Sequence, residues 1–102
     1  MHKVYLIQAG EDGPVKIGVA ANVFKRLAQY RTHDPIRLRL VGLIDGDRAD
    51  EKRLLGRFSE YRLHGEWFRP GPQLVEFIAS LPPPPFPPHR HLHLNEHLLQ
   101  HG

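Results

Sequence analysis

Four side chains with different chemistry lie in the first half of the sequence: the phenol of Tyr5, the cations of Lys16 and Arg26, and the carboxylate of Glu51. An ammonium and a guanidinium bind phosphate oxygens, and a carboxylate binds hard divalent cations such as Mg²⁺. Each of these residue types is also common at ordinary structural positions. Whether these four residues form a functional site therefore depends on the helices and strands that position them.

Two strand patterns open the chain, at Lys3–Gln8 and Val15–Ala20, and the turn residues Gly10–Pro14 join them, which predicts a hairpin. We expect Tyr5, Lys16 and Gly18 to share one face, because side chains alternate along a strand. Gly18 has no side chain, so a substrate backbone could approach closely there. The opposite face is apolar and is predicted to meet the core; it carries Val4, Leu6, Val15, Ile17 and Val19.

The later patterns predict a helix capped by Asn22 and running to about Arg31, and then a strand over Arg37–Ile44. A second helix, capped near Asp47, should reach about Tyr61, and a third should begin at Pro70 or Pro72. The segment between the last two helices reads as a turn with a short extended piece. The order ββαβαα predicts an α+β fold with a three-stranded antiparallel sheet flanked by helices.

Glu51 lies in the middle of an apolar helical stripe with Leu54, Leu55 and Phe58. A buried carboxylate needs a partner, a metal or water. Glu51 also lies in the first turn of its helix, where the helix dipole stabilises negative charge without any metal. From the residues alone, a role of Glu51 as a metal ligand and a role as a helix stabiliser are equally supported.

Two further charged residues have an ordinary interpretation beside a functional one. Arg26 borders the apolar stripe of the first helix, and an exposed helical arginine is usually solvated with a packed stem. Glu66, in the segment Gly65–Phe68, is either a second acid near a site or, more commonly, the salt-bridge partner of an arginine.

The composition fits one small domain and narrows the class of protein. The 102 residues contain 14 Lys+Arg against 11 Asp+Glu, a net charge of +3 and no cysteine. The sequence pI is about 9.6, which suits a polyanion partner and equally suits a solvated Arg-rich surface. The lack of cysteine excludes disulfides and thiolate chemistry. With no membrane-length apolar run and no signal pattern, we expect a cytoplasmic protein.

The sequence changes character after Leu81, where we place the end of a domain formed by residues 1–81. Residues 82–102 begin with a proline run and continue rich in histidine, which predicts a disordered tail. The histidines could bind transition metals weakly. A different interpretation makes the proline run a ligand for a protein-interaction domain.

Several motifs in order resemble the GIY-YIG nuclease superfamily, in particular its small phage-associated and bacterial branch. Val4-Tyr5 stands for the first motif and Lys16-Ile17-Gly18 for the second, with Arg26 eight residues later. The run from Arg26 to Pro35, and Glu51 followed by Phe58 and then Gly-Glu-Trp-Phe, also resemble this branch. The resemblance covers Val4 to about Ile78.

The resemblance implies a DNA endonuclease that hydrolyses phosphodiester bonds with one Mg²⁺ or Mn²⁺ ion and no organic cofactor. In this interpretation Glu51 binds the metal, Arg26 clamps the scissile phosphate, and Tyr5 orients or deprotonates the attacking water. Lys16 lowers the pKa of Tyr5 or contacts the phosphate. DNA is expected to contact Lys16, Gly18, Arg26 and Arg31.

The chain departs from the superfamily pattern at three positions. Lys3 replaces the Gly of the first motif, Lys16 replaces the Tyr of the second, and Leu55 stands where the branch often has His. If that His transfers a proton, its loss weakens or removes catalysis. The alternative hypothesis is therefore a DNA-binding module on the same fold with weak or no cleavage.

Overall fold

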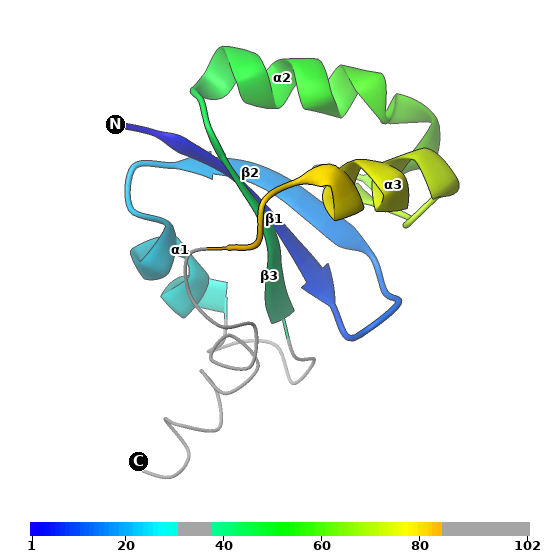
Figure 1. Cartoon of the computed structure of the whole chain (residues 1–102), viewed down its shortest axis with the longest axis horizontal. Helices are drawn as coiled ribbons and strands as arrows, with labels where there is room; N and C mark the ends of the chain where they lie inside the picture. Colours follow the sequence, from blue (N-terminus) through cyan, green and yellow to red (C-terminus); the bar gives the residue numbers. More distant parts are fainter. Residues whose placement is uncertain (31–37, 85–102) are drawn as a thin grey trace, which may run out of the picture.

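The computed structural model describes residues 1–30 and 38–84. The described elements follow the chain as β1 (Lys3–Ala9), β2 (Val15–Ala20), α1 (Val23–Tyr30), β3 (Leu38–Asp45), α2 (Arg48–Arg57), a 3₁₀ turn (Ser59–Tyr61), β4 (Arg62–His64), β5 (Trp67–Phe68) and α3 (Pro72–Ser80) (Figure 1). The predicted α+β class is confirmed. Arg31 and most of the predicted tail lie outside the described residues.

The sheet has five antiparallel strands in the order β3-β1-β2-β5-β4. The prediction of three strands was therefore wrong: β4 and β5 form a second, very short hairpin after α2. Gly65 has a φ of +56° in the turn of this hairpin, a conformation that glycine adopts without strain. Phe68 is completely buried, so burial of its ring helps to hold β5 against β2.

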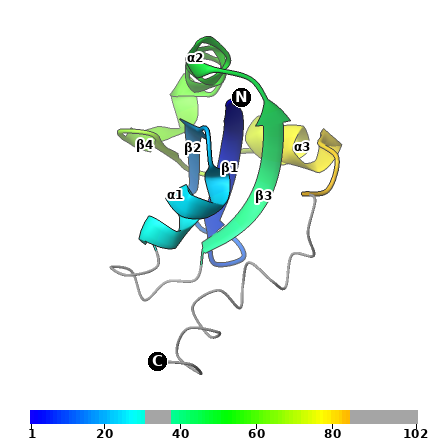
Figure 2. The ribbon, with the colours of Figure 1, turned by 90° about the vertical axis from the view of Figure 1, so that its left-hand side faces the viewer.

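Both faces of the sheet are buried at its central strands β1 and β2, whereas β4 is exposed. The predicted core face is confirmed, because Val4, Leu6, Val15 and Ile17 pack with Phe58, Tyr61 and Leu74 from the end of α2, the 3₁₀ turn and α3. The opposite face forms a second cluster with α1, made of Tyr5, Ile7, Ala20, Val23, Leu27 and Leu40. Figure 2 shows α1 and α3 on opposite sides of the sheet. Tyr5 and Gly18 therefore lie in a core, and not on an open face as expected.

The predicted helix starts are confirmed. The Asn22 carboxamide oxygen accepts a hydrogen bond from the backbone N–H of Lys25, and Asp47 caps α2 in a reciprocal capping box with Asp50. Pro72 is the first residue of α3. The end of α2 differs: the helix stops at Arg57, four residues before the predicted end at Tyr61. Phe58 leaves the helical conformation and is buried in the core.

Gly18 packs directly against Tyr5, its partner across the β1–β2 ladder. A Cβ atom at position 18 would lie 2.9 Å from Cε2 of the Tyr5 ring, and closer still to Cζ and the hydroxyl. The Tyr5 ring thus fills the space that was expected to admit a substrate backbone. This contact explains the glycine by packing inside the domain.

We predict that Gly18→Ala lowers the free energy of unfolding by about 1–3 kcal/mol, because the added methyl overpacks the Tyr5 ring. Gly56→Ala is the matched control: no atom lies within 4 Å of its Cβ position, and its helical site favours alanine. Denaturant unfolding measures both. A Gly18→Ala protein as stable as the wild type would contradict the packing described here.

Candidate functional site

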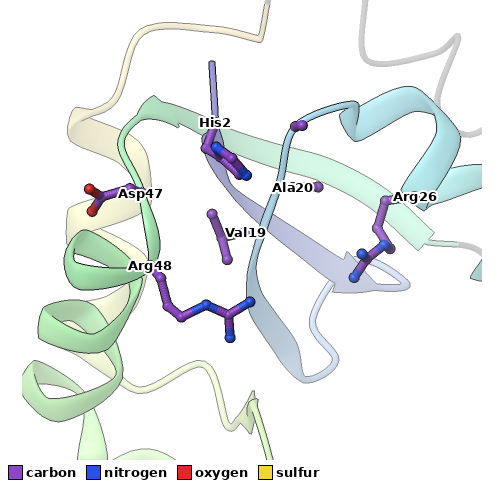
Figure 3. A pocket seen from close by; sticks show the side chains of 7 residues that line it. His2, Val19, Ala20, Arg26, Asp47 and Arg48 are labelled. Carbon is purple, nitrogen blue, oxygen red and sulfur yellow. The ribbon is translucent and has the colours of Figure 1, made fainter.

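A pocket of about 350 Å³ opens where the end of β2 meets the first turns of α1 and α2. Its lining includes Val19 and Ala20 of β2, His2, and the side chains of Arg26 and Arg48 (Figure 3). Arg26 comes from α1 and Arg48 from α2, and in Figure 3 both guanidinium groups extend toward the space beside β2. The pocket is thus flanked by two cations from opposite sides.

Sequence reasoning found Arg26 and missed Arg48. Arg48 is the first residue of α2 and lies three positions before Glu51, so the two share one side of the helix. This helical spacing was the signal that could have identified it. Two guanidinium groups about one pocket can bind the oxygens of a phosphate.

Glu51 is buried as predicted, with only 5% of the residue exposed. Burial, together with the neighbouring Glu66 carboxyl group, raises the pKa of Glu51 above its ordinary value of 4.5, and Arg48 and Lys16 partly oppose this rise. The Glu66 carboxyl group therefore lies close to that of Glu51. Two acids from α2 and the β4–β5 hairpin therefore meet beside the cations.

Lys16 belongs to the same cluster. Its Nζ lies 3.1 Å from Oε1 of Glu66 and 5.8 Å from the centre of the Trp67 ring. Glu66 was expected to pair with an arginine; its partner is a lysine 50 positions away. The ammonium group of Lys16 is thus an ion-pair partner of Glu66.

Tyr5 and Leu55 do not line the pocket; both pack in or against the hydrophobic core. Only 1% of Tyr5 is exposed. Leu55 is half-buried and packs against the core cluster, where it has a structural role. Arg31, expected to contact DNA, lies outside the described residues.

The acid pair fits a hard divalent cation. Two neighbouring carboxylates repel each other, and a bound divalent cation would offset that repulsion. Within residues 1–30 and 38–84, no cluster of three or more His, Asp and Glu side chains is placed to hold a metal. Mg²⁺ and Mn²⁺ suit such a sparse site, because Mg²⁺ in particular keeps several of its waters. Glu51 and Glu66 are the residues that fit this group.

Residues 3–80 match the model of the T5orf172 domain, and the chain belongs to this family. The domain is found in phage-associated, nuclease-like proteins. The match includes both arginines, both acids and Lys16. No curated protein and no solved structure matches the chain. In the part of the chain that the structure describes, no helix is long and apolar enough to cross a membrane.

We predict that Glu51→Gln stabilises the metal-free protein at pH 7.5. The raised pKa in the folded state means that the stability contribution of Glu51 is complete below its unfolded pKa and is lost as the pH rises through the folded value. Glutamine carries no charge and avoids this loss. We expect a higher Tm for Glu51→Gln than for the wild type at pH 7.5 and a smaller difference near pH 4.

Thermal melts in EDTA at the two pH values measure this difference, with Glu76→Gln, an exposed acid on α3, as the control. If Glu51→Gln instead melts below the wild type at pH 7.5, the carboxylate makes a favourable interaction. Glu51 would then be a first-turn stabiliser of α2.

Proposed function

We propose that the chain is a small divalent-metal-dependent DNA endonuclease that hydrolyses phosphodiester bonds. The observation that carries the proposal is the pair of acids formed by buried Glu51 and partly exposed Glu66. Neither acid lines the pocket, but Glu51 is close to Arg48, which flanks the pocket together with Arg26. Membership of the T5orf172 family supports the same class. The motifs of the GIY-YIG superfamily supply the finer hypothesis, in which Glu51 is the metal ligand and Arg26 binds the scissile phosphate.

Arg26 and Arg48 are the residues that would hold the phosphate. They come from separate helices on either side of β2, so a phosphate between them is contacted from two directions. Such contacts fix the position of the reacting phosphorus and neutralise the negative charge that grows on its oxygens in the transition state. His2 and the helix cap Asp47 complete the rim of the same pocket.

Glu51 is the residue that would hold the divalent cation, close to Arg48 on the same helix. A bound Mg²⁺ or Mn²⁺ ion supplies charge neutralisation at the phosphate and lowers the pKa of a coordinated water. The protein supplies the position of the carboxylate, which the capped first turn of α2 holds close to Arg48. Burial excludes bulk water and strengthens these electrostatic interactions.

A DNA-binding module with weak or no cleavage is the second candidate function. Two observations favour it: the half-buried Leu55 in place of a histidine, and the burial of the Tyr5 hydroxyl. Leu55 has no group that could transfer a proton, and burial keeps Tyr5 away from bulk water. The two functions share the cationic pocket and differ in whether the acid pair takes part in a reaction.

We predict that Glu51→Gln abolishes nicking of supercoiled plasmid in Mg²⁺ or Mn²⁺ while DNA affinity holds or rises. The substitution removes the metal-binding charge, keeps the shape of the side chain and relieves repulsion of the phosphate. Arg26→Ala should lose nicking together with some affinity, because it removes a phosphate contact. Nicking rates and binding constants are measured on the same preparations, with EDTA as the blank.

Glu76→Gln is the matched control and should nick like the wild type. Equal nicking by wild type and Glu51→Gln would show that Glu51 does not hold the catalytic metal. A wild type that binds DNA but never nicks with any divalent ion would establish the DNA-binding module.

We also predict that DNA binding falls steeply between low and physiological salt, because phosphate contacts release counterions. Arg26→Ala and Arg48→Ala should each reduce the slope of log K against log salt by about 1. Arg53→Ala is the control, since Arg53 lies on the same helix but pairs with Asp50. Fluorescence anisotropy measures the slopes. Equal slopes for all three variants would remove the pocket from the DNA-binding surface.

A further inference from the structure

We propose that Glu66 is a second carboxylate ligand of the divalent cation, and that Lys16 is an internal cation that holds Glu66 until the metal binds. The proposal rests on the proposed function, because it takes Glu51 as the first ligand. It adds a ligand and a competing cation that the motifs of the chain did not assign.

The backbone of Glu66 is fixed with respect to β2. Its carbonyl oxygen accepts a hydrogen bond of 3.1 Å from the N–H of Ile17. The next two residues, Trp67 and Phe68, pair with Lys16 and Val15 in the sheet. Because Phe68 is completely buried, this hairpin is anchored to the core. The Glu66 side chain therefore starts from a rigid position beside the site, as a metal ligand requires.

The Glu66 carboxyl group has two neighbours, one a cation and the other an acid. The Lys16 ammonium lies 3.1 Å away, on a side chain that is only 14% exposed. The carboxyl group of Glu51 is also close enough to Glu66 for the two acids to interact, and only 5% of Glu51 is exposed. The Glu66 side chain itself is 41% exposed and can be reached from solvent. A cation entering there meets two carboxyl groups from two separate elements.

Lys16 and a divalent cation compete for the same negative charge. Without metal, the ammonium offsets part of the repulsion between the two acids. With metal, Glu66 turns its charge to the stronger cation, and Lys16 is repelled from the site. The released ammonium is then available for a phosphate oxygen. In this arrangement Lys16 weakens metal binding, and Glu66 strengthens it.

The test measures Mn²⁺ binding directly, by calorimetry and by the electron paramagnetic resonance signal of free Mn²⁺, on the full chain without DNA. We expect Glu51→Gln and Glu66→Gln each to weaken binding at least about tenfold, because affinity follows the number of charged ligands. Lys16→Met should tighten binding several-fold. Glu76→Gln should bind like the wild type. Circular dichroism melts identify any variant that has lost its fold.

The opposite directions of the Glu66 and Lys16 variants distinguish a ligand from a structural salt bridge. If the bridge only ties β2 to the hairpin, both variants melt earlier and neither changes the Mn²⁺ affinity, which overturns the inference. If Glu51→Gln loses Mn²⁺ but Glu66→Gln keeps it, this inference fails while the proposed function stands. A wild type that binds no Mn²⁺ overturns both.

Discussion

β2 is buried on both faces, and this constraint decides where the candidate side chains lie. Val15 and Ile17 belong to one core cluster and Ala20 to the other. β1 pairs with β2 along its whole length, whereas β5 pairs only with Val15 and Lys16. The pairing on this side of β2 ends at the hydrogen bond from Ile17 to Glu66. Further along β2, at Val19 and Ala20, the start of α2 lies beside the strand, and the pocket forms there. The incomplete strand pairing thus creates the space that the two arginines flank.

The elements that were predicted correctly are those specified by nearby residues. The alternation of the β1–β2 hairpin, the caps at Asn22 and Asp47, and the proline at the start of α3 all act over a few positions. The burial of Glu51 was also predictable, since helical spacing places it with Leu54 and Phe58. These features depend on backbone preference and periodicity, which any single sequence displays.

The features that were missed depend on contacts between distant segments. The β4–β5 hairpin has only short strands, and pairing with β2 and burial of Phe68 help to hold it in the sheet. The Lys16–Glu66 pair joins residues 50 positions apart, and no local pattern indicates it. Gly18 was interpreted as an opening for substrate because the cover that α1 gives to that face of the sheet was not foreseen. Local patterns therefore predicted the elements better than the contacts between them.

The acid pair is the feature that a simple DNA-binding module does not explain. Two carboxyl groups beside a cationic pocket repel a phosphate, and each unit charge at 4 Å costs about 1 kcal/mol even in water. Burial raises this cost and also penalises the fold, as the raised pKa of Glu51 indicates. A protein that only holds DNA gains nothing from this arrangement. A protein that binds a divalent cation there recovers the cost on binding, because the cation attracts both acids and the phosphate. Functional sites commonly carry such a local loss of stability, and for this reason we propose Glu51 and Glu66 as the place of a metal-dependent reaction.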